Sequence, residues 1–304
     1  MARKKVTIFE LQKMYEAGEP ITMITAYDYP SGILAERAGV DMILVGDSLG
    51  MVVHGYEGTV PVTMEMMLLH CAAVARARGA AFLIGDMPFG TYEITPQEAV
   101  RNAIRLMQVG VDAVKLEGGA EMADTVRAIV RAGIPVQGHI GLTPQSVSKL
   151  GGFRVQGKSA ASARRLLNDA LALEDAGCFT IVLEAVPDRV AAAITDRLHT
   201  PTIGIGAGPG CSGQVLVWHD MLGLFDRFQP KFSKRFEDAG AAIQRGLSAY
   251  VEQVRARAFP AVEHCFTITD EEWEGFQQGL GDSAAGAVEA SAAGEETPLY
   301  GQAN

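Results

Sequence analysis

The chain has 304 residues, of which 48% are apolar and 20% are charged, a balance typical of a globular protein with a substantial core. Residues 268–304 hold eight acidic side chains and no lysine or arginine, so most of the net charge of −10 lies in this segment. The remaining body is close to neutral and lacks the basic excess of a nucleic-acid-binding protein. No apolar run approaches the ~20 residues of a membrane helix. We therefore expect neither nucleic acid nor a membrane as a partner.

The N-terminus and the cysteines predict a cytoplasmic protein. Three basic residues at the start, Arg3, Lys4 and Lys5, are not followed by the apolar run of a secretory signal. The four cysteines are far apart and form no CxxC pair. This spacing argues against a zinc site or a disulfide framework and suits a reducing compartment.

A repeating unit runs through the body: a helix-like segment ends in glycine, a short apolar run follows, and a polar residue stands at its end. Gly39, Gly110, Gly133 and Gly177 suit the left-handed position that ends a helix. The apolar runs are typical of parallel strands that are covered on both faces. We expect strands at residues 21–26, 42–46, 81–85, 111–116, 135–138, 179–183 and 202–205, and an eighth at 222–225.

Helices are predicted between the strands. Capping boxes begin two of them, at residues 7–10 and 95–98. About eight strands with polar residues at their carboxyl ends favour a (β/α)8 TIM barrel, a single domain over residues 1–266. An open doubly wound sheet would carry GxGxxG after its first strand, whereas the only glycine-rich run, 204–208, follows the seventh. Further helices are expected at 121–131, 160–175, 188–198 and 239–257.

The segment 267–304 differs from the body in composition. Ala, Gly, Ser and Glu dominate it, and no apolar periodicity continues after Phe276. Such a segment buries too little surface to offset the entropy of ordering it. We expect a disordered acidic tail.

Polar side chains directly follow several predicted strands. In a parallel barrel the loops after the strands converge over one mouth, so these side chains are expected to lie together. Lys115 and Glu117 are two apart on one strand and face the same way, while Leu116 packs outward. A lone Asp at a strand end more often caps the next helix, but the recurrence after successive strands favours catalysis. The candidate site residues are Asp47, Ser48, Asp86, Lys115, Glu117, His139 and Glu184.

Several carboxylates in a partly desolvated mouth repel one another unless cations compensate. Carboxylate oxygens without a thiolate nearby suit Mg²⁺. We expect Asp47 and Asp86 to be direct ligands and Glu117 to be a third ligand or a partner through water. Such an ion would polarise a small 2-oxo acid, and Glu184, away from it, is the expected base for the C3 proton. His139 is interpreted either as a substrate contact or as a core histidine.

Longer motifs resemble those of the ketopantoate (3-methyl-2-oxobutanoate) hydroxymethyltransferase family, in the family's order and over residues 6–266. They occur at residues 22–28 (TMITAYD), 45–50 (VGDSLG), 83–89 (LIGDMPF), 114–119 (VKLEGG), 138–145 (GHIGLTPQ), 151–157 (GGFRVQG), 204–208 (GIGAG) and 230–232 (PKF). The sequence departs from the pattern at Tyr56, where the family often has His, at Ser212 and at Cys265. The acidic tail lies outside the resemblance.

The resemblance implies a barrel of the phosphoenolpyruvate/pyruvate-binding type. It implies transfer of a hydroxymethyl group from 5,10-methylenetetrahydrofolate to 3-methyl-2-oxobutanoate, giving 2-dehydropantoate for pantothenate and coenzyme A synthesis. Positions matching Asp47, Asp86 and Glu117 hold one Mg²⁺ per subunit in the family, and the position matching Glu184 accepts the proton. Family members are cytoplasmic and commonly form homodecamers. The family's substrate-binding positions match Asp47, Ser48, Asp86 and Lys115.

Three other functions are alternatives to this one. A lyase of the phosphoenolpyruvate/pyruvate type also uses metal and enolate chemistry, but it generally needs a cysteine in a glycine-rich loop, and none follows the third or fourth strand. A phosphate-binding isomerase could use residues 204–208, although the carboxylates at the mouth would repel a phosphoester. A non-catalytic scaffold would have lost the mouth residues, all of which are present.

Overall fold

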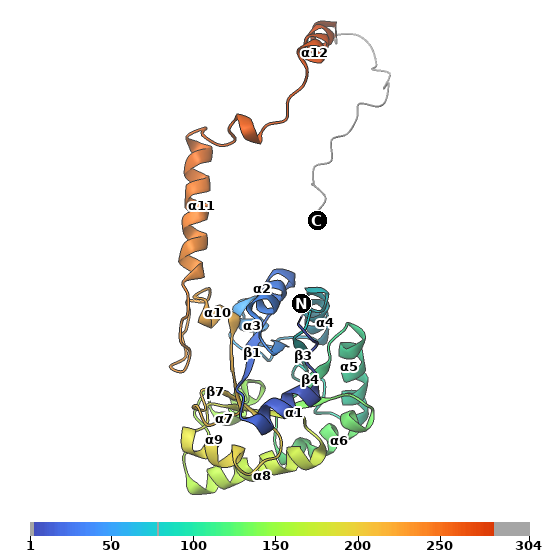
Figure 1. The fold of residues 1–304 in the computed structure, drawn as a ribbon, viewed down its shortest axis with the longest axis vertical. Coiled ribbons are helices and arrows are strands. Elements are labelled where there is room, and N and C mark those ends of the chain that lie inside the picture. Colours follow the sequence, from blue (N-terminus) through green and yellow to red (C-terminus); the bar gives the residue numbers. More distant parts are fainter. Residues whose placement is uncertain (1–2, 78, 283–304) are drawn as a thin grey trace. The chain divides into compact units, whose positions relative to one another are not determined.

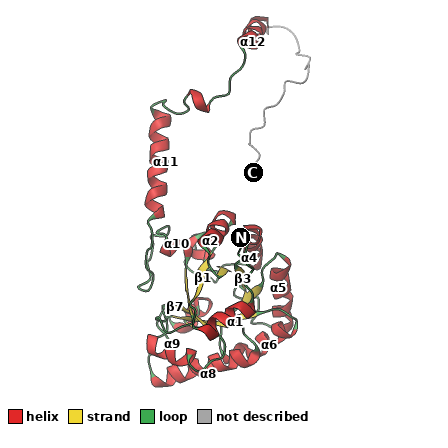
Figure 2. Cartoon of the chain, in the orientation of Figure 1, coloured by secondary structure: helices red, strands yellow, loops and turns green. Residues whose placement is uncertain are grey.

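The computed structural model describes residues 3–77 and 79–282, and the body of the chain is a closed barrel of parallel strands. Each strand pairs with the next in sequence, and the last returns to pair with the first, so the barrel has no open edge. Figure 2 shows the strands enclosed by helices. The strands are β1 (Ile21–Thr25), β2 (Met42–Val45), β3 (Phe82–Asp86), β4 (Ala113–Lys115), β5 (Val136–Gly141), β6 (Thr180–Glu184), β7 (Thr202–Ile205) and β8 (Gly213–Leu216).

Helices follow the strands around the barrel (Figure 1). The predicted capping residues Thr7 and Thr95 each accept a hydrogen bond from the backbone N–H three residues later. The helices of the body are α1 (Ile8–Ala17), α2 (Tyr29–Ala38), α3 (Leu49–Val52), α4 (Met64–Ala77), α5 (Pro96–Gln108), α6 (Ala123–Arg131), α7 (Val147–Leu150), α8 (Ala160–Ala176), α9 (Asp188–Thr195) and α10 (Trp218–Met221). Short 3₁₀ turns occupy Ala120–Met122, Pro144–Ser146 and Val262–His264.

Two apolar clusters hold the barrel together. The inner cluster fills the barrel with side chains such as Met42, Phe82 and Ile203, and Leu11 of α1 joins it. The outer cluster packs the opposite faces of the strands against the helices, with Leu116 and Leu183 among its members. Because the inner cluster fills the barrel, the mouth at the carboxyl ends of the strands has a closed floor.

Seven of the predicted strands are confirmed, and the position of the eighth was wrong. Residues 222–225 follow α10 in a loop, and the barrel is closed by β8 at Gly213–Leu216 instead. A Cβ at Gly213 would lie 2.4 Å from the carbonyl oxygen of Ile21, so only glycine lets β8 approach β1 this closely. The strand is short and partly polar, and it therefore lacks the apolar run that marks the others.

Two units divide the chain: Met1–Ile243 and Gln244–Asn304. The division falls within α11 (Ala239–Arg255), whereas composition placed the boundary after residue 266. No helix of the described residues is long and apolar enough to span a membrane.

The expectation that residues 267–304 lack regular structure was wrong for Asp270–Asp282, which form helix α12. Thr269 Oγ1 accepts the Glu272 N–H at its start, and acidic residues of the first turn suit the positive end of the helix dipole. The rest of the predicted tail, residues 283–304, lies outside the described residues.

Candidate functional site

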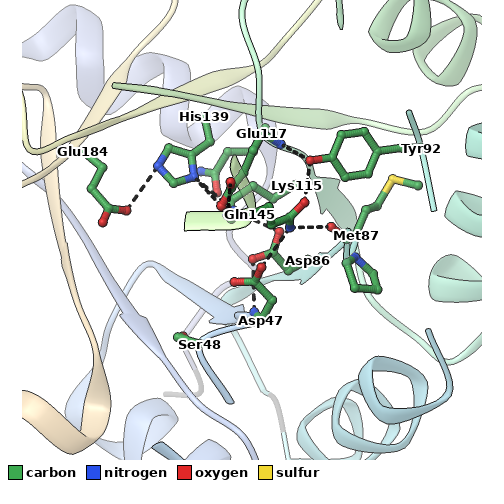
Figure 3. Close-up of polar contacts among 12 residues, drawn as sticks. Asp47, Ser48, Asp86, Met87, Tyr92, Lys115, Glu117, His139, Gln145 and Glu184 are labelled. Atoms are coloured by element: carbon green, nitrogen blue, oxygen red, sulfur yellow. Dashed lines mark hydrogen bonds and ion pairs between the residues drawn. The ribbon is translucent and has the colours of Figure 1, made fainter. Parts of the chain in front are cut away.

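The carboxyl ends of β2 to β6 supply a group of ionisable side chains at one mouth of the barrel (Figure 3). These side chains line a cavity of about 370 Å³. The seven residues predicted from sequence all line it: Asp47, Ser48, Asp86, Lys115, Glu117, His139 and Glu184. The barrel therefore brings together residues that are up to 137 positions apart in the sequence.

Asp47 and Asp86 form one side of the group. Asp86 ends β3 and is the register partner of Lys115 in β4, whose Nζ lies 2.9 Å from Asp86 Oδ1. The Asp47 backbone N–H donates to Asp86 Oδ2 over 3.2 Å. Apart from the Lys115 ammonium, Asp86 Oδ1 has no polar partner among the described residues. This oxygen can therefore accept a further ligand.

A chain of ionic contacts leads from Lys115 to Glu184 through His139. Lys115 Nζ lies 3.3 Å from His139 Nδ1 and 4.0 Å from Glu117 Oε1. His139 Nδ1 lies 3.4 Å from Glu117 Oε1, and its Nε2 lies 3.2 Å from Glu184 Oε2. The Glu184 side chain is 15% exposed, against 4% or less for the other three. Glu184 is thus the member of this chain that a ligand reaches most easily.

The charged forms of the buried groups depend on one another. Burial raises the pKa of Asp47 well above its usual value, and the neighbouring carboxylates of Asp86 and Glu117 raise it further. Burial also raises the pKa of Asp86, although Lys115 opposes it. Burial and Lys115 act to lower the pKa of His139, but hydrogen bonds to Glu117 and Glu184 outweigh them and raise it to about 9. The two carboxylates therefore favour the protonated form of His139, against burial and the Lys115 ammonium.

The carboxylates of Asp47, Asp86, Glu117 and Glu184 outnumber Lys115 and His139 in this group, so protonation of a carboxyl group or a further divalent cation would reduce their mutual repulsion. In residues 3–77 and 79–282, no three His, Cys, Asp or Glu side chains form a ready ligand set. Asp47 and Asp86, which lie together, supply two carboxylates, and Mg²⁺ typically takes one or two carboxylates plus water and substrate oxygens.

Gln145 is a central contact that sequence reasoning missed. Its Nε2 donates to Asp47 Oδ2 over 2.8 Å and to the Met87 carbonyl over 3.0 Å. Tyr92 OH donates to Gln145 Oε1 over 2.6 Å and accepts the Glu117 N–H over 3.2 Å. Because the Met87 carbonyl can only accept, the amide has one possible orientation, and Asp47 Oδ2 must be an acceptor. Gln145 thus holds Asp47 with an unprotonated oxygen turned toward it.

The loop that carries Gln145 also fixes Glu117. The Gln145 backbone N–H donates to Glu117 Oε2 over 3.0 Å, and the whole network is buried. Gln145 lies within the motif at 138–145, but it does not directly follow a strand, so the pattern of polar residues at strand ends did not include it. Tyr27 was likewise missed, although its hydroxyl lies 2.8 Å from Ser48 Oγ.

Replacing Gln145 by alanine is expected to weaken divalent-cation affinity by about 10–100-fold, the usual effect of losing a side chain that orients a metal ligand. The same variant should lose about 1–3 kcal/mol of stability, because buried partners become unsatisfied. Tyr92→Phe removes a more remote contact of the network and should have a smaller effect on affinity. Calorimetric titration with Mg²⁺, together with denaturant unfolding, would measure both. Unchanged affinity in Gln145→Ala would show that the network is only structural.

The closed parallel barrel with ionisable residues at its carboxyl-end mouth places the chain in the class of (β/α)8-barrel enzymes. Solved structures support the fold. A phosphonopyruvate hydrolase matches with a TM-score of 0.57 at 14% identity, covering 92% of this chain and 98% of that chain. A 2,3-dimethylmalate lyase of the PEP mutase/isocitrate lyase superfamily matches with a TM-score of 0.53 at 18% identity, covering 90% and 98%.

The chain belongs to the ketopantoate hydroxymethyltransferase family, whose model matches residues 5–262. It is 58% identical over 265 residues to the 3-methyl-2-oxobutanoate hydroxymethyltransferase of Moorella thermoacetica, covering 87% of this chain and 98% of the relative. It is 59% identical over 257 residues to the corresponding protein of Ignicoccus hospitalis, covering 84% and 97%. The resemblance predicted from sequence is confirmed, and the chain is a hydroxymethyltransferase.

Proposed function

We propose that the enzyme transfers the one-carbon unit of 5,10-methylenetetrahydrofolate to C3 of 3-methyl-2-oxobutanoate. With one water consumed, the products are 2-dehydropantoate and tetrahydrofolate, a step of pantothenate synthesis. The acceptor is the compound in the names of the relatives, which are 53–59% identical to this chain. Transfer to C3 of this acid requires removal of the C3 proton, and a carboxylate such as Glu184 suits its removal.

The single observation that carries this proposal is that Glu184 lies apart from Asp47 and Asp86 at the mouth of the barrel. Among the ionisable side chains of the described residues, Glu184 pairs with His139 alone, and it is 15% exposed against 2% for Glu117. Asp47 and Asp86 lie at the other side, next to Lys115. One carboxylate is thus free to act as a base while two others remain available to a cation.

The proton transfer follows from these positions. Glu184 takes the proton from C3, and the electron pair of the C–H bond forms the C2–C3 double bond of an enolate. The Lys115 ammonium faces the charge that develops on the keto oxygen and the carboxylate of the acid. The methylene carbon of the donor is bonded to two nitrogens, and both C–N bonds must break. The carbon forms one new bond to C3 and one to the oxygen of the water consumed, and both nitrogens leave protonated as tetrahydrofolate. His139, bonded to Glu184, keeps the base in position.

We propose Mg²⁺ as the cation, held by Asp47 and Asp86, with Glu117 acting from outside the inner ligand shell. When bound, Mg²⁺ polarises the keto group and makes the C3 proton more acidic. The fit rests on the group of carboxylates and on Asp86 Oδ1, whose only polar partner among the described residues is Lys115. Glu117 is already engaged by His139 and by the Gln145 N–H, which favours the outer role.

Deuterium exchange tests the acceptor and the base together. In D2O with Mg²⁺, the protein should remove the C3 proton signal of 3-methyl-2-oxobutanoate without any folate, as followed by NMR. A chelator should stop the exchange. The matched control is 3,3-dimethyl-2-oxobutanoate, which has no C3 proton and should remain unchanged. Exchange no faster than without protein would contradict the proposal.

Assembly into a homo-oligomer, a decamer by family resemblance, and a cytoplasmic location stay predictions. The apolar side chains of α11 support self-association, because Leu247, Tyr250 and Val251 are all exposed on this helix. Their spacing of three and four residues places them on one face. A mass in solution equal to one chain would contradict the oligomer.

A further inference from the structure

The cavity has two chemically different parts. Its buried lining, here called the floor, holds the carboxylates and cations described above, whereas its more exposed lining, here called the outer wall, carries aromatic rings. A five-carbon acid bound at the floor fills only part of about 370 Å³. The rings of the outer wall belong to Phe153, Phe225, Phe228 and Phe232.

The four rings are available to a flat ligand. In the described part of the chain, none of them stacks on or meets another ring. Phe153 is 52% exposed and Phe228 is 62% exposed. Phe232 lies against the backbone at Gly206, where a Cβ would come within 2.6 Å of the ring. Glycine at 206 thus lets this ring lie close over the end of β7.

Asp220 of α10 adds a polar group to the outer part of the cavity. Its carboxylate has no hydrogen bond or ion pair to any described residue, although the side chain is half-buried. Burial alone raises its pKa to about 6. A half-buried carboxylate without a protein partner can accept hydrogen bonds from a ligand in place of water.

Two cations complete the outer wall. Arg154 and Lys231 line the cavity, and neither forms an ion pair with a carboxylate of the described residues. Arginine and lysine beside an open cavity suit an anionic ligand group. The outer part therefore combines flat apolar surfaces, one hydrogen-bond acceptor and two positive charges.

We propose that this outer part binds the one-carbon donor, with Asp220 accepting hydrogen bonds from the N–H groups of a reduced pterin ring. The phenylalanine rings cover the faces of the pterin and of the aminobenzoyl group. Arg154 and Lys231 pair with the glutamate carboxylates at the far end. This inference rests on the proposed function, because it takes a tetrahydrofolate as the donor and adds the residues that recognise it.

The test measures binding of tetrahydrofolate to the full-length protein by calorimetry. Asp220→Asn removes the charge with little change of shape and should weaken binding by tenfold or more, the range for loss of a hydrogen bond to a charged group. The matched control is Asp226→Asn, an exposed aspartate six residues later that does not line the cavity. It should leave the dissociation constant unchanged within twofold.

A second variant keeps the test decisive if Asp220→Asn folds poorly. Phe228→Ala changes an exposed ring and should also weaken tetrahydrofolate binding several-fold, with an unchanged circular dichroism spectrum. If Asp220→Asn folds, unchanged affinity in that variant would overturn the inference; if it does not fold, unchanged affinity in Phe228→Ala would do so.

Exchange of the C3 proton needs no donor, and its outcome separates this inference from the proposed function. If the wild type exchanges the C3 proton and Asp220→Asn loses affinity for tetrahydrofolate, both the proposed function and the inference are supported. If the wild type exchanges the C3 proton and binds tetrahydrofolate, and Asp220→Asn binds it with unchanged affinity, only the inference is overturned. Wild-type exchange without any tetrahydrofolate binding overturns the folate donor and the inference together.

Discussion

Glu184→Gln is expected to lower the rate of C3 exchange by about 10²–10⁴-fold, the usual contribution of a positioned general base. The amide has nearly the shape of the carboxylate but cannot take the proton. It can still accept a hydrogen bond from His139 Nε2, which lies 3.2 Å from Glu184 Oε2 in the wild type. NMR of the 2-oxo acid in D2O would follow the exchange.

Two controls accompany this variant. Glu184→Asp keeps a carboxylate but shortens the side chain, so it should retain more exchange than the amide. Cation affinity should change little in either variant, because Glu184 lies away from Asp47 and Asp86. Exchange at the wild-type rate in Glu184→Gln would exclude this residue as the base.

Asp86→Asn is expected to have the second large effect, a loss of Mg²⁺ affinity beyond the about 10–100-fold that follows removal of an outer partner. The amide removes one of the two carboxylates available to the cation. It also leaves the Lys115 ammonium, a buried charge, without its nearest partner at 2.9 Å. Breaking such a pair typically costs about 3–5 kcal/mol of stability.

Titration calorimetry with Mg²⁺ and denaturant unfolding without metal would separate the two effects of Asp86→Asn. Asp41→Asn is a matched control, because Asp41 is buried at the start of β2 and bonds to Thr22, far along the strand from the mouth. It should lower stability but leave cation affinity unchanged. Equal affinity in Asp86→Asn and the wild type would remove Asp86 from the ligand set.

Most of the fold could be predicted because the parallel strands are covered on both faces and therefore read as apolar runs. β8 was not predicted, because it does not form such an apolar run. It contains the exposed Gln214, and its pairing with β1 depends on the absence of a side chain at Gly213. Helix α12 escaped for a different reason: Trp273, Phe276 and Leu280 have helical spacing, but glycines interrupt the segment and obscure the pattern.

The strand-end residues of the site were predictable from the geometry of a parallel barrel. Parallel strands bring their carboxyl ends together, and alternation along β4 directs Lys115 and Glu117 inward. Gln145 and Asp220 were not predictable in this way. They lie in a 3₁₀ turn and a four-residue helix, where position is set by contacts distant in sequence. Such contacts appear only once the barrel is closed.

The central claim is that one mouth joins proton removal from the 2-oxo acid to capture of a one-carbon unit. The most direct test supplies the protein with Mg²⁺, 3-methyl-2-oxobutanoate and 5,10-methylenetetrahydrofolate labelled with ¹³C at the methylene carbon. The label should appear in the new hydroxymethyl group of 2-dehydropantoate, and a chelator should prevent this. Label that stays on the donor while C3 exchange proceeds, or transfer that is undiminished by the chelator, would contradict the account.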